Sequence, residues 1–167
     1  MERGDSTWPR LPTTVSAVAL ELPRESFLAL AAVAWADGRI SRGEGIGLVR
    51  AAEASGLSGD DLDAVKKAIA EKTSLSAFDD SSLTPIQKGV TLAVASWLAR
   101  VDGVASREEL EHLEELGTKL GLSAFQRKSG MSAAFDIACL PEGHKPEKYD
   151  FVALVAKVRE KMPTLGN

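Results

Sequence analysis

The sequence contains an internal repeat, which limits the folds that the chain can adopt. When the chain is shifted by 65 residues, residues 37–58 (DGRISRGEGIGLVRAAEASGLS) align without a gap on residues 102–123 (DGVASREELEHLEELGTKLGLS). The two segments are identical at nine of 22 positions, including the initial Asp-Gly and the final Gly-Leu-Ser. Such self-similarity predicts two copies of one structural unit, each burying its apolar face against the other.

Each copy is predicted to form helices joined by short turns, which are called corners below. Ser41-x-x-Glu44 and Ser106-x-x-Glu109 are capping boxes, in which serine and glutamate side chains bond the free N–H groups at a helix start. Ala and Leu are abundant and aromatic residues make up only 5% of the chain, a composition that favours helix over strand. The sequence therefore predicts an all-α fold, a compact bundle of about seven to eight helices from an internal duplication.

The predicted domain organisation follows the repeat. Residues 1–24 form an N-terminal extension, partly flexible, with a short helix around Val15 to Leu22. Residues 25–138 form the duplicated domain, with repeats at about 25–72 and 85–138. Residues 139–167 form a C-terminal loop and helix that we expect to pack on the same domain.

Charge and composition exclude several classes of protein. The net charge is −4 and the sequence has no long Lys/Arg run, which argues against a nucleic-acid partner. A single cysteine, Cys139, rules out an internal disulfide and fits a reducing compartment; we expect it to be a buried small hydrophobe. No stretch approaches the roughly 18 apolar residues of a membrane span, and no signal peptide is recognised. We therefore expect a cytoplasmic protein without a membrane span.

The Asp-Gly corners resemble the second half of an EF-hand calcium loop. Such a loop also needs oxygen ligands two and four residues before the Asp. Those positions hold Trp35 and Val33 in the first copy, and Arg100 and Leu98 in the second. A standard EF-hand is thereby excluded.

Two interpretations of the corners remain open. In the first they are purely architectural, because Asp, Gly, Ser and Glu all favour turns and helix starts. In the second they form a nonstandard divalent-cation site that uses Asp37 with Glu44 and Asp102 with Glu109, since hard cations prefer carboxylate oxygens. Calcium or magnesium would then be the ligand rather than zinc.

Catalysis is not predicted. Two histidines and one cysteine leave little for acid–base or nucleophilic chemistry, and no glycine-rich phosphate loop is present. Glu109-x-x-His112 resembles one di-iron helix motif, but the first copy has Gly47 in place of the histidine. We expect a non-enzymatic protein.

The helix at 107–120 is predicted to be amphipathic, with a leucine stripe inward and an acidic face in solvent. The inward residues are Leu110, Leu113, Leu116 and Leu120, and the solvated residues are Glu108, Glu109, Glu111, His112, Glu114 and Glu115. That acidic face offers an alternative function, a metal-free helical interaction or scaffold module with a protein partner. The sequence leaves the oligomeric state open.

Residues 25–138 resemble the TerB-like family of tellurite-resistance proteins. The resemblance lies in FLALAAVAWADGRISRGEGIGLVRAAEASGLS and LAVASWLARVDGVASREELEHLEELGTKLGLS, where an apolar helix, an Asp-Gly corner, x-x-Ser-x-x-Glu and Gly-Leu-Ser follow in order. It implies an all-helical, internally repeated fold, a role in tellurite resistance or another stress response, and metal association. Asp37, Glu44, Asp102 and Glu109 match the family's acidic corner residues.

Overall fold

The computed structural model describes residues 20–75, 79, 81–101, 105–141, 143, 145 and 148–166, and all regular secondary structure within those ranges is helical. This confirms the all-α prediction. The short helix expected around Val15 to Leu22 lies mostly outside the described residues, and Leu20 to Pro23 are not helical. The elements are α2 (Arg24–Ala34), η1 (Trp35–Asp37), α3 (Arg42–Ala54), α4 (Gly59–Ala70), α5 (Pro85–Ala99), α6 (Arg107–Lys119), α7 (Ala124–Ala138), α8 (Phe151–Lys161) and η3 (Pro163–Gly166).

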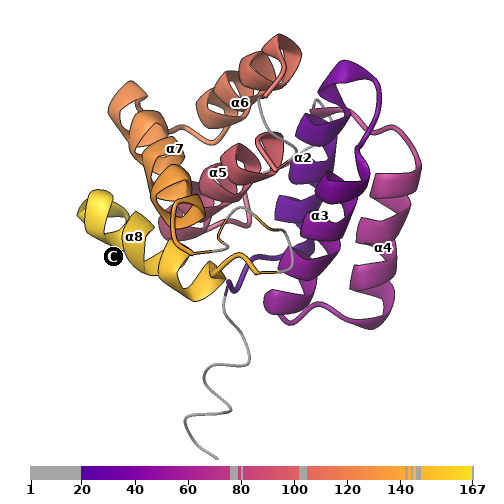
Figure 1. The fold of residues 1–167 in the computed structure, drawn as a ribbon, viewed down its shortest axis with the longest axis horizontal. Coiled ribbons are helices and arrows are strands. Elements are labelled where there is room, and N and C mark those ends of the chain that lie inside the picture. The colour runs from indigo at the N-terminus through magenta and orange to yellow at the C-terminus, as the bar shows by residue number, and fades with distance from the viewer. Residues whose placement is uncertain are drawn as a thin grey trace, which may run out of the picture.

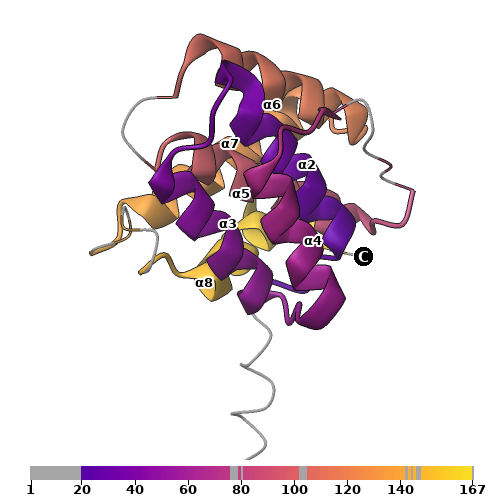
Figure 2. The same cartoon turned by 90° about the vertical axis from the view of Figure 1, so that its right-hand side faces the viewer.

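The two repeats form the two halves of the bundle. Helices α2, α3 and α4 lie together on one side and α5, α6 and α7 on the other, with α2 in contact with α5 between them (Figure 1). Helix α8 packs against α5 and α7. Turning the molecule by 90° shows α3 beside α4 and α6 crossing above α2 (Figure 2). Within the described part of the chain, no helix is both long and apolar enough to cross a membrane.

Local sequence signals explain where the helices begin and turn. Helices α3, α5, α6 and α7 each start with a complete capping box, which confirms the two Ser-x-x-Glu boxes predicted at α3 and α6 and adds boxes at α5 and α7. Ser58 precedes α4 but makes no side-chain capping bond. Gly38 adopts φ 96°, a left-handed conformation that glycine reaches without strain, so the first Asp-Gly corner depends on this residue.

Contacts between equivalent residues show that the repeats face each other about an approximate twofold axis. Ser26 and Thr91 are separated by the repeat length of 65, and their hydroxyl oxygens lie 3.0 Å apart in the core. Thr91 donates its own proton to the Gln87 carbonyl oxygen at 2.7 Å, so Ser26 is the donor to Thr91. Contact between equivalent residues is what an approximate twofold relation between the repeats produces.

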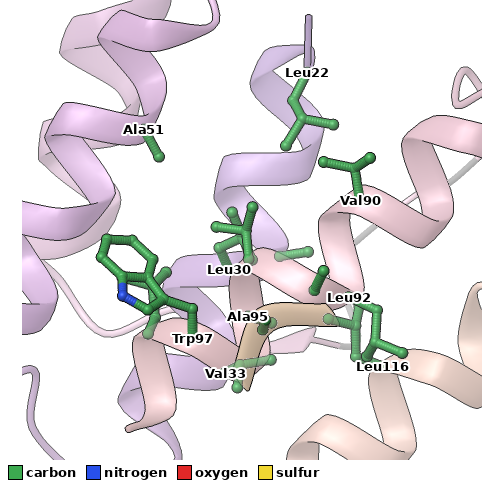
Figure 3. Packing of buried hydrophobic residues seen from close by; sticks show 14 of the residues in the cluster. Leu22, Leu30, Val33, Ala51, Val90, Leu92, Ala95, Trp97 and Leu116 are labelled. Atoms are coloured by element: carbon green, nitrogen blue, oxygen red, sulfur yellow. The ribbon is translucent and has the colours of Figure 1, made fainter. Parts of the chain in front are cut away.

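The core between the halves is continuous. Leucine, valine and alanine side chains from α2, α3, α5 and α6 come together in one cluster, with Trp97 at one side of it in Figure 3. The equivalent leucines Leu48 and Leu113 are both fully buried. Two sequence expectations were wrong: Leu110 is 39% exposed rather than inward, and Cys139 is exposed rather than buried.

Aromatic residues hold the C-terminal segment against the repeats. Trp97 of α5 stacks on Tyr149, with ring centroids 4.2 Å apart, and meets Phe151 edge-on at 5.4 Å. The guanidinium of Arg50 lies 4.9 Å from the centre of the Phe151 ring, and its Nη1 donates to the Tyr149 carbonyl at 2.9 Å. Helix α3 approaches Trp97 closely at Gly47, where a Cβ atom would lie 3.1 Å from the ring.

Candidate cation site at the repeat interface

Glu44 and Glu109 are first of all capping residues. The Ser41 N–H donates to Glu44 Oε1 at 2.9 Å, and the Glu44 N–H donates to Ser41 Oγ at 3.1 Å. In the second repeat the Ser106 N–H donates to Glu109 Oε1 at 2.9 Å, and the Glu109 N–H donates to Ser106 Oγ at 3.0 Å. Each carboxylate therefore uses one oxygen at its own helix start and has the other available.

The two glutamates come together at the repeat interface. They are equivalent under the 65-residue shift, their carboxyl groups are hydrogen-bonding neighbours, and they are only 7% and 6% exposed. The prediction that Glu109 belongs to a solvated face is therefore wrong. It failed because the glutamate side chain turns back over the helix start, toward the axis, when it closes a capping box.

Burial and the neighbouring carboxyl group change the acidity of Glu44. Burial raises the pKa of Glu44 to about 8, and the adjacent Glu109 carboxyl adds to the rise, against the lowering effect of the Ser41 N–H. Glu44 Oε2 is buried and receives no hydrogen bond from any described donor. Two carboxylates cannot hydrogen-bond each other without a shared proton, so with its pKa raised to about 8 Glu44 is largely protonated at neutral pH.

The capping function alone does not require carboxylates at these positions. The boxes at α5 and α7 use Gln87 and Gln126 instead, with the same pair of bonds and no buried charge. A glutamine at either interface position would cap its helix and also donate to its neighbour. Capping therefore leaves the choice of two buried, adjacent carboxyl groups unexplained, and such ionisable groups with shifted pKa values are typical of functional sites.

Only part of the predicted four-residue site can be placed. Glu44 and Glu109 come together, whereas Asp102 and the side chain of Asp37 lie outside what the structure describes. Among the described side chains, no group of three or more His, Cys, Asp or Glu is placed to hold a metal. Once Glu44 has lost its proton, the carboxylate oxygens of the pair are hard, anionic donors that fit calcium or magnesium, which complete their shells with water and carbonyl oxygens.

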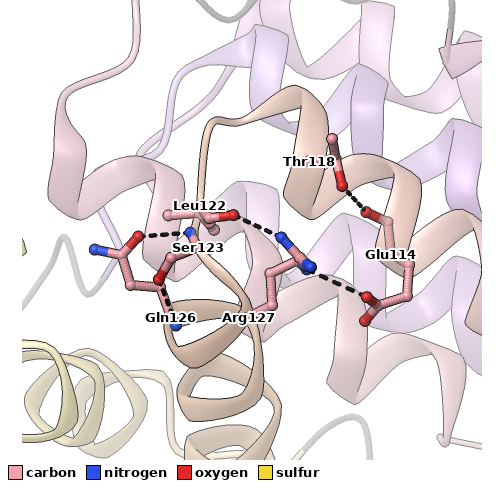
Figure 4. A network of polar contacts seen from close by, with 6 residues as sticks. All are labelled: Glu114, Thr118, Leu122, Ser123, Gln126 and Arg127. Carbon is pink, nitrogen blue, oxygen red and sulfur yellow. Dashed lines mark hydrogen bonds and ion pairs between the residues drawn. The ribbon is translucent and has the colours of Figure 1, made fainter.

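The acidic face of α6 is exposed as predicted, apart from Glu109. Glu108, Glu111, Glu114 and Glu115 all lie at the surface, and His112 is half-buried with Nδ1 2.9 Å from the Glu108 carbonyl. Figure 4 shows that Glu114 is also engaged within the fold, by Arg127 Nε at 3.2 Å. The protein partner expected at this face remains a prediction.

Sequence reasoning found the residues of the pair but missed their contact. The available signal was the recurrence of Glu, rather than Gln, at the third position of both duplicated boxes. It also missed the apolar residues Ile46 and Val49, which lie on the solvent side of α3.

Comparison with known proteins identifies no relative, since no protein-family model, curated protein or solved structure matches the chain.

Proposed function

We infer that this protein is a non-enzymatic binding protein that holds a divalent cation between Glu44 and Glu109. The observation that carries the proposal is Glu44 Oε2, which is buried beside a second carboxyl group and receives no hydrogen bond from a described donor. A cation placed between the two carboxylates would replace the shared proton and neutralise both charges. Calcium, magnesium or manganese suits such oxygen donors.

Asp37 and Asp102 are proposed to complete the site from the two corners. Each precedes its glutamate by seven residues, across the same turn and capping box. The site would thus take the same pair of side chains from each repeat. Its position on the approximate twofold axis supports a role in binding rather than catalysis, because both glutamates are also held in structural bonds.

The resemblance to the TerB-like family gives this binding a physiological setting. We propose a cytoplasmic stress-response role of the tellurite-resistance type, in which the bound cation stabilises the contact between the two repeats. This rests on the duplicated Asp-Gly and Ser-x-x-Glu corners, which also carry the cation proposal. Loss of a cation bound between the repeats would weaken the contact that holds the two halves together.

Calorimetric titration of metal-free protein tests this function. At pH 8 we expect calcium, magnesium or manganese to bind with measurable heat and to raise the melting temperature. Binding should weaken strongly near pH 5.5, because protons then compete for the same oxygens. The Glu44→Gln/Glu109→Gln variant, which keeps both capping boxes, should show neither heat nor a thermal shift.

The matched control is Glu108→Gln, which removes an exposed carboxylate from the same helix as Glu109. It should bind cations as the wild type does. If the wild type gives no heat and no change in melting temperature at millimolar metal, the pair is a protonated structural contact and the cation proposal is wrong.

A further inference from the structure

Helix α3 carries an apolar groove on its solvent-facing side, and Ser41, which caps α3 together with Glu44, also lines it. The groove has a volume of about 710 Å³, and its apolar lining is Ile40, Gly45, Ile46, Val49 and Ile69. The absence of a side chain at Gly45 leaves room in the groove, because a Cβ atom there would be in contact with Ile69 Cγ2 at 3.7 Å. Ile46 is 42% exposed, so this surface lacks a partner within the described chain.

The fold itself does not require these apolar residues. The repeat shift pairs Gly45, Ile46 and Val49 with Leu110, Glu111 and Glu114, in that order. Helix α6 nevertheless forms the same 13-residue helix from the same kind of capping box as α3. This internal comparison shows that glutamates are tolerated at two of the equivalent positions, so helix formation alone does not account for Ile46 and Val49.

The rim of the groove is basic, although the chain as a whole carries a net charge of −4. Arg42 and Lys66 are exposed at the rim, and Arg50 adds a third positive charge beside its bond to Tyr149. Glu53 is the one acidic residue among the described residues of the lining. A partner that complements this surface combines an apolar stripe with negative charge at its flanks.

We propose that the groove between α3 and α4 binds an amphipathic helix of another protein, with acidic residues flanking its apolar stripe. The lining runs from Arg42 to Glu53 along α3, about three helical turns, which is the length over which a docked helix presents side chains at i, i+3 or i+4, and i+7. The acidic flanks of the partner would pair with Arg42 and Lys66. The carboxyl groups of the cation site are not in the groove lining, so the groove adds a second binding function to the protein.

A second copy of this chain is a poorer occupant than a separate protein. Its own acidic helix, α6, buries Leu113 and Leu116 in the core and therefore lacks a free apolar stripe. Helix α8 exposes Val152, but it ends in the basic residues Arg159 and Lys161, which the rim would repel.

The test uses three fluorescein-labelled helical peptides of about 18 residues and fluorescence anisotropy with the full-length protein. One has a leucine stripe flanked by Glu, the second has the same stripe flanked by Lys, and the third has the Glu flanks with the stripe changed to Ser. We expect only the Glu-flanked stripe to bind saturably, at least about tenfold more tightly than the Lys-flanked peptide, and to weaken with added salt.

Variants copied from the second repeat locate the binding. Ile46→Glu/Val49→Glu and, separately, Gly45→Leu should each weaken the Glu-flanked peptide about tenfold or more, because truncating or blocking the centre of an interface has effects of that size. Val152→Glu, outside the groove, should leave binding unchanged. Circular dichroism and melting temperature confirm that each variant folds.

Several results would overturn the proposal. They are equal binding of the Lys-flanked peptide, no saturable binding of any peptide, or full binding by both groove variants. Concentration-dependent dimerisation that Ile46→Glu/Val49→Glu abolishes would assign the groove to a second copy instead. None of these outcomes depends on cation binding, since the peptide assay runs without added metal and the cation titration runs without peptide.

Discussion

Replacing Glu44 with Gln is expected to remove most of the pH dependence of stability between about pH 4.5 and about pH 8. In that range the folded wild type keeps a proton on Glu44 that the unfolded chain releases. The free energy of unfolding therefore falls as pH rises, by up to about 1.4 kcal/mol per pH unit for one proton. Below pH 4.5 both states are protonated and the slope disappears.

The glutamine variant has no proton to lose. Its side-chain oxygen still accepts from the Ser41 N–H and its amide can donate to Glu109, so at pH 8 it should be more stable than the metal-free wild type by about 2–4 kcal/mol. Urea unfolding in the presence of a chelator, repeated across the pH range, measures this. A wild type whose stability stays flat from pH 5 to pH 8, or a variant that keeps the slope, would contradict the shared proton.

Replacing Trp97 with Ala is expected to destabilise the fold by about 3–5 kcal/mol, as truncation of a buried aromatic residue does. Trp97 is 3% exposed and contacts both Tyr149 and Phe151, so the loss opens a cavity where α5 meets the C-terminal segment. For a chain of this size the melting temperature should fall by about 10 °C. Thermal unfolding followed by circular dichroism measures the change.

Trp97→Phe is the matched control. The indole Nε1 is buried without a described hydrogen-bond partner, so phenylalanine removes an unsatisfied donor and keeps an aromatic ring for stacking. We expect it to cost about 1 kcal/mol, much less than alanine. Equal losses for the two variants would mean that ring stacking contributes little to holding α8 in place.

The helices and their starts were predictable because their signals are local. Ser41, Thr84, Ser106 and Ser123 each stand three residues before a Glu or Gln, and the capping bonds form within those four residues whatever the rest of the chain does. The repeat likewise predicted two similar halves. These inferences needed no knowledge of how the halves pack.

The errors concern residues whose surroundings are set by distant parts of the chain. Leu110 lies on the predicted leucine stripe, but in α6 only Leu113, Leu116 and the following Leu120 reach the core. Cys139 has the chemistry of a core residue and lies exposed where α7 ends. Glu109 was assigned to solvent from its acidic neighbours, whereas the twofold relation between the repeats brings it against Glu44.

The two repeats have diverged on their outer faces while keeping the same inner contacts. Leu48 and Leu113 are equally buried, and Ser26 meets Thr91 at the axis. Outside, the first repeat presents Ile46 beside basic residues and the second presents Glu111 on an acidic helix. We infer that the duplication supplied a symmetric site inside and left the two surfaces free to acquire different binding properties.

The most direct test is a carbon-13 NMR titration of the Glu44 side-chain carboxyl group, in metal-free protein and again with saturating calcium. The shared-proton and cation account expects a midpoint near pH 8 without metal. It also expects that midpoint to fall by at least about one pH unit when calcium occupies the pair, since a bound cation favours the charged form. A midpoint near 4.5 in both samples, unchanged by calcium, would contradict it.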